Sequence, residues 1–224
     1  MEKKLKTIVI APHPDDEIFG VGGTLLRRKN EGAKTACIFV TTPSKRLNWS
    51  KEKIRQRSLE INQVSALLNF DELFELKFPS ADLDQVSMGD LVAAISNVFI
   101  NFKPNEIFIP HPSDIHTDHK IVFNAAVSCS KWFRFPFVKR ILTYETLSET
   151  EFGINPNQTF KPNVFINIEP YIEKKLKAIS IYKSELEEFP FPRSLEAARA
   201  LAMLRGSSSG FKAAEAFELL KEII

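Results

Sequence analysis

The sequence predicts an α/β fold in which a mostly parallel sheet is flanked by helices. Three observations lead to this prediction. Short β-rich runs alternate with longer segments of helical periodicity along the 224 residues. The chain is 44% hydrophobic and 26% charged, as in ordinary soluble globular proteins. It also shows no internal repeat, low-complexity tract or linker, so we expect one domain spanning residues 1–224.

The first half of the chain repeats a unit of one strand and one helix. Runs rich in Val, Ile, Phe and Thr mark the strands, Gly32 ends the first helix, and Ser50 is a suitable N-cap for the second. In that second helix, apolar residues such as Ile61 and Val64 recur at helical spacing. The expected elements are strands at Leu5–Ala11, Thr35–Thr41 and Glu72–Phe78 and helices at Gly20–Glu31, Ser50–Asn69 and Asp90–Phe102.

The second half continues the alternation and ends in helices. The expected strands are Glu106–Pro110, Arg140–Thr146 and Val164–Ile168, and the expected helices are Ile121–Lys131, Pro170–Ser184, Ser194–Leu204 and Lys212–Ile223. Strands that alternate with helices imply parallel βαβ units with right-handed crossovers.

Composition excludes several classes of protein. The formal net charge is only +2 and no long basic tract is present, which argues against a nucleic-acid partner. Cys37 and Cys129 sit in apolar runs without CxxC spacing, as reduced buried thiols do. The apolar stretches are too short for a signal peptide or a transmembrane segment. We therefore expect a cytoplasmic protein.

All four histidines lie in two short segments, and each segment directly follows an expected strand. His13 belongs to APHPDDE, and His111, His116 and His119 belong to HPSDIHTDHK. In open parallel sheets, binding sites form beyond the carboxyl ends of the strands, so we predict that the two segments meet. Imidazole and carboxylate groups together are the ligands of zinc or a similar divalent ion.

The spacing within the two motifs suggests roles for individual residues. His13 and Asp16 are three residues apart and could converge on one ion, which leaves Asp15 free to take a proton. His116 and His119 are also three apart, where a helix is expected to begin, and His119 could complete a His-Asp-His set. Taken singly, each residue could instead be a turn or capping residue. For His111, a structural role and a role in the site fit the sequence equally well. Together, the acidic residues favour a cation, because buried carboxylates without one are costly.

Glycines at Phe19–Gly23 (FGVGG) raise the alternative of a dinucleotide site. The segment lacks the full GxGxxG spacing, and the acidic residues before it would repel a pyrophosphate. Close packing of a helix on a strand is the better explanation.

Both histidine motifs resemble those of the LmbE/PIG-L family of metal-dependent de-N-acetylases. APHPDDE with a following GGTL and HPSDIHTDHK carry the resemblance, which extends to FPSADL and the closing AAEAF. One departure is Glu185, where the family often has glutamine. The resemblance implies a Rossmann-like three-layer fold and a zinc ion, or ferrous iron, held by His13, Asp16 and His119. It further implies Asp15 as general base and His116 as acid and electrophile.

The family resemblance also implies a class of substrate and its contacts. The substrates would be N-acetylglucosamine joined to another group, such as an inositol, a malate or a nucleotide. Arg57 matches the family's arginine, with Arg55 close to it in sequence, and Asp82 is a second candidate contact. Asp118 is suited either to keep His116 protonated and oriented or to cap the following helix.

The leading hypothesis is therefore a zinc-dependent hydrolase that removes the N-acetyl group from an amino-sugar conjugate. One alternative is an amidase acting on a non-sugar acyl amide. Another is a binding module that keeps the metal or the sugar site without turnover. Phenylalanine-rich segments at Phe133–Phe137 and Phe189–Pro192 fit a buried core, an apolar pocket or the interface of a homo-oligomer.

Overall fold

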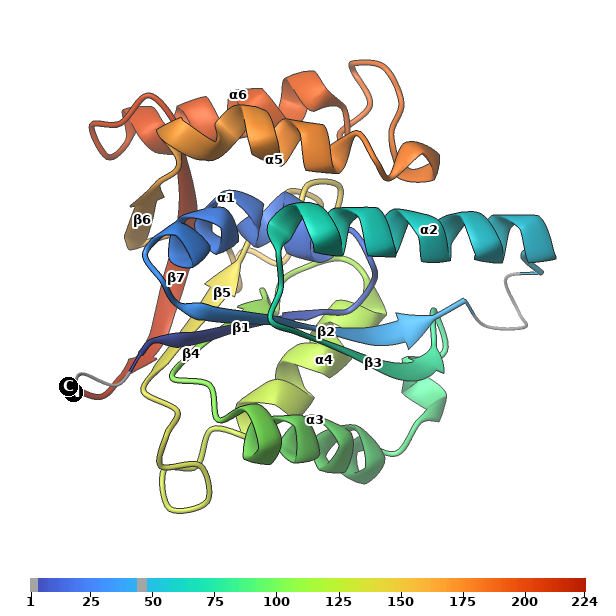
Figure 1. Cartoon of the computed structure of the whole chain (residues 1–224), viewed down its shortest axis with the longest axis vertical. Helices are drawn as coiled ribbons and strands as arrows, with labels where there is room; N and C mark the ends of the chain where they lie inside the picture. Colours follow the sequence, from blue (N-terminus) through green and yellow to red (C-terminus); the bar gives the residue numbers. More distant parts are fainter. Residues whose placement is uncertain (1–3, 44–47) are drawn as a thin grey trace.

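The computed structural model describes residues 4–43 and 48–224. Within them, seven strands form one sheet with helices on both faces (Figure 1). The strands are β1 (Lys6–Ala11), β2 (Lys34–Thr42), β3 (Glu72–Pro79), β4 (Glu106–Pro110), β5 (Arg140–Tyr144), β6 (Val164–Asn167) and β7 (Ala214–Glu222). The helices are α1 (Asp16–Asn30), α2 (Lys51–Leu68), α3 (Met88–Phe102), α4 (Thr117–Ser128), α5 (Ile172–Ile179) and α6 (Leu195–Ser207), and the 3-10 turns are η2 (Leu83–Gln85), η3 (Glu169–Tyr171) and η4 (Lys183–Glu185).

The strand order β3-β2-β1-β4-β5-β7-β6 explains how distant motifs can meet. The chain leaves β1 toward β2 and β3 on one side, and later returns to β4 and β5 on the other side. β1 and β4 pair in parallel, so their carboxyl ends lie next to each other. This reversal of direction is the topological switch point at which α/β sheets place their sites.

Helices cover both faces of the sheet (Figure 1), and an apolar core lies between the sheet and each helical layer. On one face, α1, α2, α5 and α6 pack through side chains such as Leu25, Val64 and Ile179. On the other, α3 and α4 pack through Ile95 and Val122. The expected three-layer α/β fold with a mostly parallel sheet is confirmed.

Most helix boundaries agree with the sequence, and Ser50 caps α2 by accepting a hydrogen bond from the Lys53 backbone N–H. α1 begins at Asp16, four residues before the expected start, and the segment expected to be helical at Pro170–Ser184 contains the shorter α5. The glycines of α1 serve close packing, as expected. A Cβ on Gly23 would lie 2.7 Å from the Ile168 side chain.

The prediction of a helix at Lys212–Ile223 is wrong, because this segment forms β7 between β5 and β6. Its Ala, Glu, Leu and Lys residues favour a helix, but propensity is weak beside tertiary pairing. β7 forms antiparallel backbone hydrogen bonds with both β5 and β6. In addition, the Glu215 carboxylate accepts hydrogen bonds from the backbone N–H groups of Gly23 and Thr24 and pairs with Lys175.

Other expectations about the interior are met in part. Cys37 and Cys129 are buried and unpaired. Within the described ranges, no helix combines the length and the apolar character that crossing a membrane requires. Among the phenylalanines singled out, Phe135 is buried, whereas Phe133 and Phe189 are exposed.

Candidate metal centre and pocket

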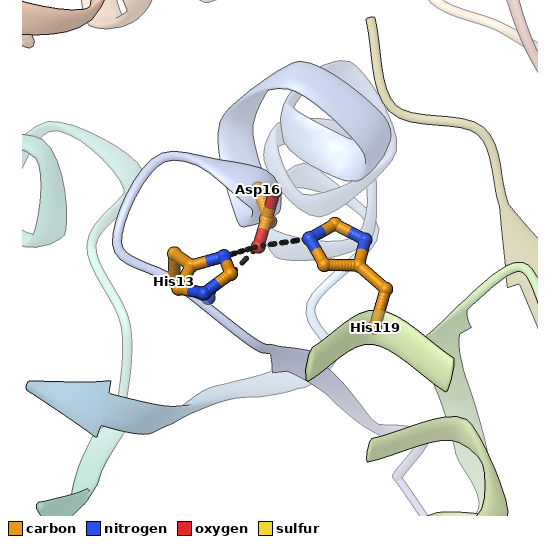
Figure 2. Close-up of side chains that lie close together, drawn as sticks. All are labelled: His13, Asp16 and His119. Carbon is orange, nitrogen blue, oxygen red and sulfur yellow. Dashed lines mark hydrogen bonds and ion pairs between the residues drawn. The ribbon is translucent and has the colours of Figure 1, made fainter. Parts of the chain in front are cut away.

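The two histidine motifs meet at the carboxyl ends of β1 and β4, as predicted. His13 follows β1, Asp16 is the first residue of α1, and His119 lies in the first turn of α4. The three side chains point toward one another (Figure 2). Asp16 Oδ2 lies 3.5 Å from His13 Nδ1 and 3.3 Å from His119 Nε2, and it accepts a hydrogen bond from the His13 backbone N–H.

These separations suit a metal ion. Zinc with four ligands at 2.0–2.1 Å in a tetrahedron places neighbouring ligand atoms about 3.3 Å apart. The ligand atoms of His13, Asp16 and His119 lie within 4.8 Å of one another. His13, His116 and Asp118 form a second trio of the same compactness, but there the Asp118 carboxylate already accepts backbone hydrogen bonds from Ala81 and Leu83. The first trio is the better candidate.

Each of the two histidines in the first trio is anchored through its other ring nitrogen by a buried carboxylate. Asp118 Oδ2 lies 3.0 Å from His13 Nε2, and Asp114 Oδ2 lies 2.8 Å from His119 Nδ1. Asp114 also accepts a hydrogen bond from the Thr150 hydroxyl. Carboxylates placed in this way fix the tautomer and the orientation of metal-binding imidazoles.

Electrostatics in the trio also suit a divalent cation. Burial disfavours charge on His13, but hydrogen bonds to Asp118 and Asp16 raise its pKa to about 9. The charges of Asp16 and Asp114 likewise raise the pKa of buried His119 well above its usual value. Burial alone would raise the pKa of Asp16, but the two histidines lower it. The acidic surroundings that favour a proton on each histidine also favour a divalent cation, and binding of a metal displaces protons from its ligands.

Asp15 lies beside the trio in a strained backbone conformation. It is the N-cap residue of α1, with φ of 131°, and its side chain makes no capping hydrogen bond. The Glu17 carboxylate accepts the Asp15 backbone N–H and the Tyr182 hydroxyl, which holds this turn in place. Burial, followed by the charges of Asp16 and Glu185, raises the pKa of Asp15 well above its usual value. Strain and a raised pKa are both common at functional sites.

His116 caps α4 and borders the same pocket. Its Nδ1 accepts a hydrogen bond from the Asp118 backbone N–H, so a proton on the neutral ring belongs to Nε2. Burial and the charges of His13 and His119 lower the pKa of His116 to about 4. The expectation that the Asp118 carboxylate keeps His116 protonated is therefore wrong, because that carboxylate faces His13 instead. The helix cap is His116 and not Asp118.

A pocket of about 260 Å³ extends from this cluster to two arginines. Arg57 is buried and lines the pocket, whereas Arg55 is exposed on α2. Arg193 lines it as well, and Glu185 lies between the two guanidinium groups. Trp49, Glu149 and the loop residues Ser80 and Ala81 complete much of the wall.

His119 and Asp118 stand behind the pocket wall, against Asp16 and His13, and Asp82 and His111 lie outside it. Asp82 directly precedes η2, next to the loop residues that do line the pocket. His111 is buried against Phe160, accepts the Ser113 backbone N–H, and lies 3.3 Å from Glu218 Oε2. Its contacts are those of a structural residue.

Asp114, Arg193 and Trp49 are among the residues that the structure brings to the site and that the sequence analysis did not single out. Asp114 belongs to the second motif, three residues after His111, so the motif itself could have indicated that Asp114 lies at the site. Arg193 and Trp49 come from segments far from either motif, and only the fold brings them to the pocket.

Comparison with known proteins gives a consistent result. The profile of the family described as GlcNAc-PI de-N-acetylase (PIG-L) matches residues 8–130. The chain is 27% identical to an uncharacterized deacetylase, YaiS, of Escherichia coli, over 81% of this chain and 92% of that one. It is 24% identical to the diacetylchitobiose deacetylase of Thermococcus kodakarensis, over 97% and 84% of the two chains. The crystal structure of the conserved protein TT1542 from Thermus thermophilus superposes with a TM-score of 0.79 at 27% identity, over 98% and 96% of the two chains.

Proposed function

This chain belongs to the PIG-L family, and we propose that it is a metal-dependent deacetylase that removes the N-acetyl group from an amino-sugar conjugate. The observation that carries the proposal is the His13–Asp16–His119 trio with Asp15 beside it. Three ligands leave room for water and substrate, as a catalytic metal site requires. Deacetylases among the relatives support the reaction class.

We propose His13, Asp16 and His119 as the metal ligands, with zinc as the metal and ferrous iron as the alternative that suits the same donors. A divalent ion in this position supplies Lewis acidity, which polarises a carbonyl and lowers the pKa of water. Asp118 and Asp114 are then positioning residues, because each fixes the ring of one ligand histidine.

Asp15 is the proposed general base. Its carboxylate lines the pocket and takes the proton of the water that attacks the acetamide carbon. Burial and the charges of Asp16 and Glu185 raise the pKa of Asp15, and a carboxylate of higher pKa is the stronger base. The Arg193 guanidinium, 3.5 Å from Asp15 Oδ2, orients that carboxylate.

His116 is the proposed electrophile, which donates a hydrogen bond and keeps its proton. With Nδ1 occupied by the Asp118 backbone N–H, the neutral ring presents an Nε2–H donor to the oxygen that becomes negative as water adds. A neutral imidazole can serve in this role. The proton that Asp15 has taken then goes to the leaving amine as its bond to the acetyl carbon breaks, which releases acetate and the free amino sugar.

The test is acetate release from a panel of N-acetylglucosamine conjugates by the metal-loaded protein. Acetate should appear in proportion to metal content and should stop after the metal is removed by a chelator. A panel of N-acyl amino acids in the same assay separates an amidase that acts on non-sugar amides. Metal-loaded protein that binds sugars but releases no acetate would refute the proposal in favour of a binding module.

A further inference from the structure

The end of the pocket away from the metal trio is built from two guanidinium groups and one carboxylate. Arg57 comes from α2, Glu185 from η4 and Arg193 from the segment before α6. Glu185 Oε1 pairs with the Arg57 guanidinium, and Glu185 Oε2 lies 3.3 Å from Arg193 Nη1. One carboxylate therefore bridges two positive charges from separate segments.

The arginines are held in these positions by further contacts. Arg57 donates to the Pro14 carbonyl at 2.7 Å and to the Ser184 hydroxyl at 2.9 Å, so its guanidinium spans from the first motif to η4. Arg193 Nη1 also lies 3.5 Å from Asp15 Oδ2. Both guanidinium groups are thus paired with carboxylates of this chain before any ligand arrives.

Carboxyl groups outnumber guanidinium groups around the pocket. The ionisable carboxyl groups in its wall are Asp15, Asp16, Glu149 and Glu185, and the guanidinium groups are Arg57 and Arg193. Buried Glu60 lies 3.5 Å from Arg57 Nε and adds a further carboxylate partner. A ligand that brings a phosphate or carboxylate would have to displace Glu185 from the arginines, which leaves a half-buried carboxylate without its partner.

We infer that Glu185 acts as a built-in anion for Arg57 and Arg193 and thereby selects substrates whose aglycone is uncharged, such as a further sugar, over anionic conjugates. This inference rests on the proposed deacetylase function. It assigns Glu185 a role in specificity, because removing its charge would leave Arg57 with Glu60 and Arg193 with Asp15 as carboxylate partners and would make this end of the pocket more positive.

A matched pair of substrates tests the selectivity. Methyl N-acetylglucosaminide and N-acetylglucosamine 1-phosphate differ in charge at the same position of the sugar. The wild-type protein should have the higher kcat/KM for the methyl glycoside. Glu185→Gln should shift the ratio of the two kcat/KM values toward the phosphate by about tenfold or more, since one negative charge has been removed at close range. Glu187→Gln, the same change at an exposed residue nearby, should leave the ratio unchanged.

Binding measurements separate this inference from the proposed reaction. The chain has two tryptophans: Trp49 lines the pocket within 5.5 Å of the Arg57 guanidinium, and Trp132 is exposed. In a Trp132→Phe background, Trp49 fluorescence should report tighter binding of the methyl glycoside than of the 1-phosphate, and Glu185→Gln should shift this preference toward the phosphate.

The outcomes are distinct. If no variant releases acetate but Glu185→Gln shifts the binding preference, the proposed function fails and the charge role of Glu185 stands. If acetate is released but the wild type prefers the phosphate, or Glu185→Gln leaves both ratios as they were, the inference is overturned while the reaction stands. Circular dichroism of each variant confirms that the ratios come from folded protein.

Discussion

The two ends of the pocket are built in different ways. At the metal end, His13 and His119 are anchored by Asp118 and Asp114, both fully buried, at the ends of the central strands. At the arginine end, Glu185 and Arg193 are partly exposed and come from irregular segments near the end of the chain. The sheet thus fixes the metal end, while the arginine end is drawn from α2, η4 and the segment before α6.

His119→Ala should have the largest effect, because it removes one of the three proposed ligands at the metal end of the pocket. We expect the metal content to fall from about one ion per chain to near zero and acetate release to fall to background. Elemental analysis after gel filtration measures the first effect. His111→Asn is the matched control from the same motif and should keep its metal. Retention of stoichiometric metal by His119→Ala would contradict the ligand assignment.

Asp15→Asn should separate catalysis from metal binding within the same end of the pocket. The variant should keep its metal but lose at least ~100-fold in kcat, the usual contribution of a general base. Steady-state kinetics and elemental analysis on the same sample provide both readouts. In contrast, Glu185→Gln should change kcat for the methyl glycoside far less. Full activity in Asp15→Asn would require another base.

Asp114→Asn tests whether the anchoring carboxylates matter as well as the ligands. The substitution keeps the shape of the side chain but removes the charge that holds His119 Nδ1. Loss of such an outer partner typically costs about 10–100-fold in metal affinity. Competition with a fluorescent chelator measures the affinity, and Asp90→Asn, at an exposed position on α3, is the control. Unchanged affinity would mean that the rigidity of the metal end does not depend on Asp114.

Arg57→Lys tests the arginine end, where the expected effect is on substrate binding. A lysine keeps the charge but cannot contact Pro14, Ser184 and Glu185 at the same time. The displaced cationic group should lose its hydrogen bond to the substrate. A loss of about 1.5 kcal/mol in this bond should raise KM by roughly tenfold and leave kcat largely unchanged. Arg55→Lys, two residues away and exposed, should have no effect on either constant. A fall in kcat without a change in KM would place Arg57 with the metal end instead.

The sequence predicted the metal end better than the arginine end, for a physical reason. His13 and Asp16 belong to one short motif and His119 to another, and each motif follows a buried strand whose pattern is plain. Adjacent parallel strands then bring the motifs together. Arg193 carries no such local pattern, because only the packing of the last third of the chain brings it to Asp15.

β7 shows the same limit for the fold. Its residues favour a helix locally, and it becomes a strand because it fills the place between β5 and β6. The role of Asp118 was also misassigned, since sequence proximity pointed to His116 while the turn of α4 directs the carboxylate to His13. Contacts between neighbours in sequence are thus less certain than the meeting of two strand ends.

His111→Asn should have the smallest effect, because buried His111 lies outside the pocket wall and belongs to neither end. Burial lowers the pKa of His111 below its usual value of 6.5, against the raising effect of Asp114 and Glu218. The folded state therefore keeps this ring neutral at a pH where the unfolded chain takes up a proton. Stability linked to His111 is present above about pH 6.5 and is lost as the pH falls below it.

Urea denaturation of wild type and His111→Asn at several pH values between about 7.5 and 5 measures this loss, because asparagine has no proton to take up. The stability of the wild type relative to the variant should decline as the pH falls, and both proteins should keep the same metal content. Parallel pH profiles would mean that His111 titrates alike in the folded and unfolded states. A decline confined to metal-free protein would instead tie His111 to the metal end, despite its contacts with Ser113 and Glu218.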